Sequence, residues 1–127
     1  MSEMRGYNDG NLIVLKSKQF AIRCVNLYKF LCDEHNDYVM SRQILRSGTS
    51  IGANVKEAIR AQTLPDFITK MNVALKEASE SEYWIELLQE TNFIDSTSAN
   101  SLLADCVELI KLLTAIIKTS KEKQQNI

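Results

Sequence analysis

Proline and glycine are scarce in this chain, which has one Pro and four Gly among 127 residues. Because these residues break helices and form turns, their scarcity favours a few long helices joined by short links. The sequence has no run of about 18 apolar residues, so no membrane-spanning helix is predicted. Residues 1–10 lack the apolar stretch of a signal peptide, and we therefore expect a cytoplasmic protein.

Cysteine and histidine are too few for the common metal and redox motifs. The three cysteines, Cys24, Cys32 and Cys106, have no Cys-x-x-Cys spacing, and we interpret all three as buried, reduced thiols. The single histidine, His35, is expected in a solvated loop. A zinc site or a di-iron bundle would need further histidines. We therefore predict no metal, no cofactor and no catalytic residue, and we do not expect an enzyme.

Apolar residues recur at alternating spacings of three and four, which is the pattern of helices with one buried face. The pattern predicts helices over about residues 16–34, 39–61, 64–92 and 96–120. Short connections force neighbouring helices antiparallel, so the expected fold is all-α, an antiparallel up-down four-helix bundle. We expect one domain at residues 12–121, with flexible tails at 1–11 and 122–127. The expected buried positions are Phe20, Cys24, Leu27, Leu31, Ile44, Ile51, Val55, Ile59, Phe67, Met71, Ala74, Ala78, Ser81, Ile85, Leu88, Leu102, Cys106, Leu109, Leu113 and Ile116.

Several local signals refine this prediction. Thr63 is a good N-cap for the third helix, with Pro65 in its first turn, and the fourth helix is expected to open at Asp95 or Ser96. Gly48 and Gly52 lie inside the second helix, where each costs about 1 kcal/mol relative to Ala. We therefore predict close packing of a neighbouring helix at these glycines. Residues 12–15 are either the start of the first helix or an extended arm.

The chain has more apolar residues than a lone four-helix bundle must bury. The surplus residues are Leu103, Ile110 and Ile117 in the fourth helix, and Tyr83, Trp84 and Leu87 in the third. They indicate either a generous core or a subunit interface.

Charge is nearly balanced overall, at −1, but it is unevenly distributed along the sequence. Four cations of the second helix, Arg42, Arg46, Lys56 and Arg60, share one face opposite its apolar stripe and span about 27 Å. Such a row suits the phosphates of a nucleic-acid backbone. It also suits acids of another subunit, such as Glu82 and Glu86, or plain exposure to water.

The segment 41–58 resembles the signature of the four-helix-bundle family of ribosomal RNA intervening-sequence proteins. The matching residues are Gln43, Arg46, Ser50, Ile51, Asn54 and Glu57, and Ala74 and Glu80 fit a second family segment. The resemblance extends over about residues 16–118. It implies a four-helix bundle, a ring-shaped homopentamer and no enzymatic activity. A similar protein that accompanies diversity-generating retroelements contacts a reverse transcriptase and nucleic acid, so the resemblance also points to RNA, DNA or a protein as a partner.

The polar residues of the signature also have a structural interpretation. We treat Gln43, Arg46, Ser50, Asn54, Glu57 and Glu80 as a structural polar motif, in which Arg46, Asn54 and Glu57 form a hydrogen-bonded network at a helix or subunit contact. The functional hypothesis is a non-enzymatic homo-oligomer that binds RNA or DNA through Arg42, Arg46, Lys56 and Arg60. The alternative is a protein–protein assembly scaffold in which these cations make subunit contacts.

Overall fold

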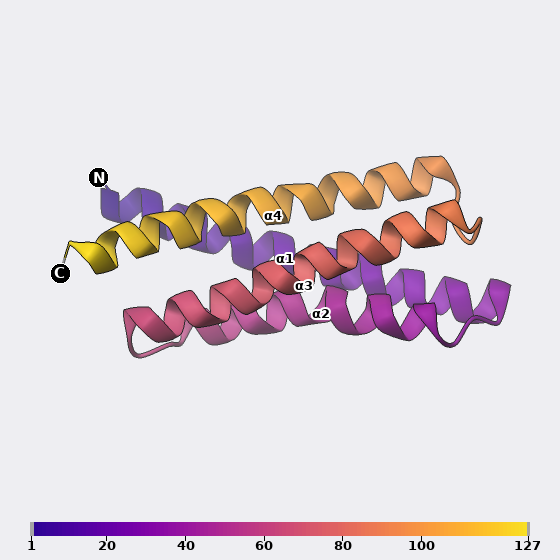
Figure 1. The fold of residues 1–127 in the computed structure, drawn as a ribbon, viewed down its shortest axis with the longest axis horizontal. Coiled ribbons are helices and arrows are strands. Elements are labelled where there is room, and N and C mark those ends of the chain that lie inside the picture. Colours follow the sequence, from indigo (N-terminus) through magenta and orange to yellow (C-terminus); the bar gives the residue numbers. More distant parts are fainter. Residues whose placement is uncertain (1, 127) are drawn as a thin grey trace.

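The computed structural model describes the backbone of residues 2–126 and the side chains of residues 12–126. Four helices follow one another: α1 (Ser2–His35), α2 (Met40–Ile59), α3 (Leu64–Glu90) and α4 (Ser96–Gln125). Each packs against the next, and α1 contacts α4 to close the arrangement. Figure 1 shows the four helices running up and down along one long axis. The all-α up-down four-helix bundle predicted from the sequence is confirmed.

The helix ends show why the chain turns where it does. Thr63 is the N-cap of α3, and its hydroxyl accepts a hydrogen bond from the Asp66 amide at 3.2 Å. Asp95 caps α4 in the same way, with its carboxylate accepting from the Ser98 amide at 2.7 Å. This bond lowers the pKa of Asp95. The predicted cap at Thr63 and the predicted start of the fourth helix at Asp95 or Ser96 are therefore confirmed, and each cap satisfies an amide that the first helical turn leaves without a partner.

Two asparagines reverse the chain after α1 and α3. Asn36 and Asn92 adopt positive φ angles of 51° and 66°, a conformation that Asn tolerates better than most residues. Beyond them, the Asp37 amide donates to the Leu31 carbonyl at 3.1 Å and the Phe93 amide to the Leu88 carbonyl at 2.9 Å. These bonds close the last turns of α1 and α3, and only the bond at the end of α3 has the spacing of a Schellman motif.

The core follows the predicted stripes with three shifts. Ile59, expected inside, is 49% exposed because it ends α2 at the molecular surface. At the expected positions Phe67 and Ile116, the side chains are half-buried, and the next residues, Ile68 and Ile117, are buried in their place. The remaining predicted core positions are all buried. The stripes of four helices therefore meet in one hydrophobic core.

The first and last helices are longer than predicted. The backbone is helical from Ser2 and to Gln125, whereas the sequence predicted flexible tails over residues 1–11 and 122–127. Residues 12–15 are helix rather than an extended arm, and Ile13 among them is fully buried. Extending an existing helix adds one hydrogen bond for each residue ordered, so polar ends can join a helix that the core has already formed. Residues 1 and 127, and the side chains of residues 2–11, lie outside the described part.

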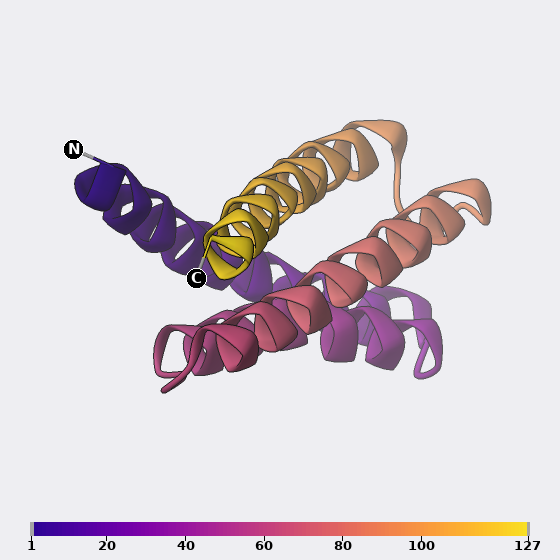
Figure 2. The ribbon, with the colours of Figure 1, turned by 60° about the vertical axis from the view of Figure 1, so that its left-hand side comes forward.

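The helices are not equally close to one another. α2 packs extensively against both α1 and α3, whereas α1 and α4 share the smallest contact. Figure 2 shows α1 and α4 diverging toward the end where α1 stops and α4 begins. Partly buried side chains, including Trp84, Leu103 and Ile110, pack against the core.

Gly48 allows the closest approach of α1 to α2. A Cβ atom at Gly48 would lie 2.8 Å from Cβ of Cys24, and closer still to its Sγ. Because Cβ of Cys24 is fixed to the backbone of α1, no rotation of its side chain relieves that overlap. Gly52 differs, since a Cβ there would be in ordinary contact with the backbone of Ser17 at 3.5 Å. α2 runs continuously through both glycines.

These two glycines give a matched pair of stability predictions. Gly48→Ala should lower the free energy of unfolding by about 1–2 kcal/mol, because overpacking of about 1–3 kcal/mol outweighs the gain in helix propensity. Gly52→Ala should raise it by up to about 1 kcal/mol, because that gain meets no clash. Urea unfolding followed by circular dichroism measures both. Equal effects of the two substitutions would show that the contact with Cys24 does not limit the packing.

Candidate functional site

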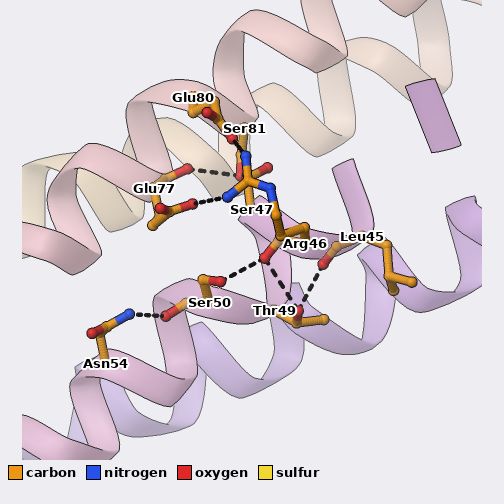
Figure 3. Close-up of polar contacts among 9 residues, drawn as sticks. All are labelled: Leu45, Arg46, Ser47, Thr49, Ser50, Asn54, Glu77, Glu80 and Ser81. Carbon is orange, nitrogen blue, oxygen red and sulfur yellow. Dashed lines mark hydrogen bonds and ion pairs between the residues drawn. The ribbon is translucent and has the colours of Figure 1, made fainter. Parts of the chain in front are cut away.

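Arg46 lies at the centre of the signature segment and reaches across to α3. Its guanidinium donates to Glu77 Oε2 at 3.2 Å and to Glu80 Oε2. Figure 3 shows the side chain bridging the two helices between the two carboxylates. The Arg46 side chain is 49% exposed and that of Glu77 is 22% exposed, so water screens the pairs in part. Arg46 therefore joins α2 to α3 within one chain.

Beneath this ion-pair cluster, the two helices meet through small polar side chains. The Oγ atoms of Ser47 and Ser81 lie 2.9 Å apart and are buried, and Ser81 Oγ is also 2.9 Å from the Glu77 carbonyl oxygen. Serine occupies little space, so α2 and α3 approach closely here (Figure 3). A buried hydroxyl without a partner is costly, and this pair satisfies both groups.

Other polar residues of the signature bond to their own helix. Ser50 Oγ donates to the Arg46 carbonyl at 2.7 Å, and Asn54 Nδ2 donates to the Ser50 carbonyl at 2.8 Å. Glu57 pairs with Lys70 of α3 at 3.3 Å. Within the chain, Arg46, Asn54 and Glu57 therefore have different partners and do not bond to one another, and a network of these residues at a subunit contact stays a prediction.

Gln43 and Glu80 complete the predicted polar motif. Gln43 is half-buried in the first turn of α2, where its backbone amide donates to the Val39 carbonyl at 3.3 Å. Glu80 is the residue that pairs with Arg46. The structure thus joins the two signature segments through the α2–α3 contact.

The four cations predicted to share one face of α2 fall into separate groups. Arg46 turns to α3, whereas Arg42, Lys56 and Arg60 are exposed. None of these three forms an ion pair with any side chain of residues 12–126. Lys56 and Arg60 line a groove between α1 and α2, together with Lys18 of α1. Sequence reasoning missed Lys18 because a helical wheel of α2 cannot show a residue of a neighbouring helix.

The groove between α1 and α2 has a volume of about 460 Å³. Apart from its three cations, its lining is small or apolar: Val14, Ser17, Ala21, Thr49, Gly52, Ala53 and Ile59. The side chains of Val14 and Ile59 are 40% and 49% exposed. The groove therefore combines uncovered apolar surface with positive charge.

The outer face of α1 is also apolar in part. Leu15 and Ile22 lie seven residues apart and are 56% and 54% exposed. This spacing places them above one another on a helix.

The cysteines are structural rather than nucleophilic. Burial raises the pKa of both the Cys24 and the Cys106 thiols to about 12, so both stay protonated near neutral pH. All three cysteines are free thiols, but Cys32 is only partly buried, contrary to prediction. It lies in the last turns of α1, with its Sγ 3.6 Å from the carbonyl oxygen of Asp37.

The single histidine packs against aromatic rings at the end of α1. His35 is exposed at the end of α1, where its ring stacks edge-on between Phe30 and Phe93, at 5.3 Å from each. Within residues 12–126, no group of three His, Cys, Asp or Glu side chains is arranged to hold a metal ion. In the same part of the chain, no helix is long and apolar enough to cross a membrane.

Comparison with known proteins identifies a family and a similar solved structure. Residues 10–115 match the model of a family described as 23S rRNA-intervening sequence protein. A solved structure from Bacteroides thetaiotaomicron VPI-5482, a protein of unknown function from the S23 ribosomal protein family, is 55% identical. The match has a TM-score of 0.85 and covers 87% of this chain and 98% of that one. Among curated proteins, none matches the chain.

The ion-pair cluster predicts a small and salt-dependent stabilisation. Arg46→Ala should lower the free energy of unfolding by about 0.5–1 kcal/mol, with a smaller loss in 1 M salt, because the pairs are partly exposed. A double-mutant cycle with Glu77→Ala, measured by urea unfolding, isolates the coupling. Arg42→Ala, in an equally exposed cation of α2 that forms no such pair, is the control and should change stability by less than about 0.5 kcal/mol. Zero coupling between Arg46 and Glu77 would contradict the structural role.

Proposed function

The chain belongs to the 23S rRNA-intervening sequence protein family, and we propose that it works as a non-catalytic assembly module that self-associates through the outer face of α1. The observation that supports this proposal is the exposure of Leu15 and Ile22, more than half of each side chain, one above the other on α1. In a monomeric bundle, apolar side chains that stay in water contribute no hydrophobic free energy to stability.

Burial of this outer face would supply the free energy for association. Complete burial of a Leu or Ile side chain is worth about 1.5–3 kcal/mol, and a symmetric assembly repeats that gain at every interface. The family resemblance favours a closed ring of five copies, which is part of this proposal. The chemistry of the described side chains supports a role without catalysis, because the two buried thiols have pKa values of about 12 and His35 stacks against phenylalanines.

Mass in solution tests the self-association. The wild-type protein should sediment as a multiple of its 14.4 kDa chain mass, and the double variant Leu15→Glu/Ile22→Glu should sediment near 14.4 kDa. Introduced carboxylates would lose too much hydration at a buried interface to be tolerated there. Val39→Glu is the matched control, since Val39 is 72% exposed but lies outside α1.

The circular dichroism of the double variant should match that of the wild type, because both substituted positions face water in the single chain. A monomeric wild-type protein, or an unchanged mass of the double variant, would overturn the proposal.

A nucleic-acid adaptor is the second candidate, favoured by the exposed cations Arg42, Lys56 and Arg60 of α2, with Lys18 beside them. The pairing of Arg46 with α3 removes one of the four cations on which the sequence hypothesis depended. The remaining row still spans about 27 Å of helix, enough to follow several phosphates.

Salt dependence tests this second candidate. Anisotropy of labelled structured RNA and duplex DNA should show an affinity loss on the order of 10²-fold between 50 and 200 mM salt if four cations contact phosphates. The double variant Arg42→Glu/Arg60→Glu should abolish binding. Lys111→Glu/Lys118→Glu, in exposed cations of α4, should weaken it far less. Absence of binding at 50 mM salt would leave the assembly role alone.

A further inference from the structure

We propose that the groove between α1 and α2 is a docking site for an acidic amphipathic helix of another protein. The groove adjoins the stripe of Leu15 and Ile22, because Lys18, which lines the groove, lies three residues from Leu15 and four from Ile22 on α1. The groove lies on the side of α1 that packs against α2, whereas Leu15 and Ile22 point away from the core.

The shape of the groove results from small residues on the two facing helices. Ala21 of α1 and Thr49, Gly52 and Ala53 of α2 form a low floor. Gly52 adds no side chain, although the nearest atoms of Ser17 would leave room for a Cβ at 3.5 Å. The groove is therefore more open than the close packing of α1 on α2 requires. A furrow bordered by two helices accepts a third helix, whose side chains fill the space that the small residues leave.

The positive charge of the groove favours a partner helix with negative charge. Lys18, Lys56 and Arg60 line the groove, and among the side chains of residues 12–126 no carboxylate does. By contrast, the hollow between α1 and the start of α4 is lined by Arg23 together with Asp95. Lys56 and Arg60 lie four residues apart, one turn along α2. Two carboxylates with the same one-turn spacing on a partner helix would match them.

The apolar part of the groove favours a protein helix over a nucleic acid. Val14 and Ile59 are about half-exposed, and a hydrated phosphate backbone would leave them so. Leucines between the acids of an amphipathic helix would cover them. Removal of water from the groove would also strengthen the attraction between the carboxylates and the three cations.

Several acids of α3 are already engaged within their own chain. Glu77 and Glu80 of α3 already pair with Arg46. Glu82 lies against Cys106 of α4, where its charge contributes to the raised pKa of that thiol. Glu86 and Glu90 of α3 are exposed, so α3 of a second copy is the competing occupant, which the mass of the assembly distinguishes from a partner of different sequence.

Peptide binding tests the docking site on the full chain. The probe is a fluorescein-labelled helical peptide with Leu and Glu at spacings of three and four, compared with the same peptide carrying Lys in place of Glu and with a scrambled acidic peptide. Anisotropy should show binding of the acidic amphipathic peptide that is at least about tenfold tighter than that of either control, because only this peptide presents its acids and leucines on adjoining faces.

Variants of the groove locate the site. Lys56→Glu and Ala53→Glu should each weaken binding by about tenfold or more, since a carboxylate in the groove repels the peptide acids. Lys111→Glu and Ala115→Glu, at exposed positions of α4, are the matched controls and should leave the affinity within about twofold. Neither groove variant should change the mass of the assembly, so the test is independent of self-association through Leu15 and Ile22.

Three outcomes would overturn the proposal. The first is equal binding of the acidic and the scrambled peptides. The second is displacement of the peptide by structured RNA whose own binding depends on Lys56, which would assign the groove to nucleic acid. The third is a Lys56→Glu variant that is monomeric in solution while the wild-type protein is an oligomer, which would assign the groove to a second copy.

Discussion

Cβ of Cys24 on α1 faces the backbone of α2 at Gly48, with no room for a side chain between them. This contact sets how closely α1 and α2 approach, and the position of the groove beside it follows from that approach. On its opposite side, α2 meets α3 through the paired hydroxyls of Ser47 and Ser81. α2 is thus held at short range by two neighbours, and small residues at both contacts make this possible. The contact between α1 and α4 has no comparable constraint and is the least extensive.

The polar residues of the signature segment are explained by these helix contacts. Arg46 and Glu80, which belong to separate segments of the signature, meet at the α2–α3 seam. Ser50 and Asn54 donate to carbonyls of their own helix, which satisfies both side chains without a partner from outside. A pattern of polar and small residues at fixed offsets therefore describes a way to pack three helices. It need not describe a ligand site, and the exposed cations Lys56 and Arg60 lie outside it.

The sequence was sufficient to predict most of the fold, because the periods of apolar residues and the caps are local properties. Thr63 and Asp95 were identified as helix starts for the physical reason that the structure shows. The errors arose where the outcome depends on another element. Ile59 has the right period for the core but ends its helix at the surface. Arg46 has the right angle for the cationic face but lies within reach of two carboxylates of α3. Lys18 lines the groove because α1 lies beside α2, an arrangement that the pattern of a single helix does not show.

Charge is segregated between the two halves of the bundle, which a net charge of −1 conceals. Between residues 16 and 60 there are eight bases (Lys16, Lys18, Arg23, Lys29, Arg42, Arg46, Lys56, Arg60) and four acids (Asp33, Glu34, Asp37, Glu57). Between residues 66 and 108 there are nine acids (Asp66, Glu77, Glu80, Glu82, Glu86, Glu90, Asp95, Asp105, Glu108) and two bases (Lys70, Lys76). The hairpin of α1 and α2 is therefore basic, and α3 with the first part of α4, as far as Glu108, is acidic, whereas the rest of α4 carries Lys111, Lys118, Lys121 and Lys123.

The ion pairs of the described side chains follow this division. Lys16 pairs with Glu108, Arg23 with Asp105, and Arg46 with Glu77 and Glu80, so each joins the basic half to the acidic half. The pair of Glu57 and Lys70 crosses the same boundary with the signs reversed. Lys16, Arg23 and Arg46 are thus neutralised within the chain. Lys18, Lys56 and Arg60 lie on the far side of α1 and α2, where none of the four helices, over residues 12–126, places an acidic face beside them. The positive charge of the groove follows from the division of the bundle into a basic and an acidic half. An acidic helix docked in the groove would neutralise cations on the outer side of α2, as α3 already does on its inner side.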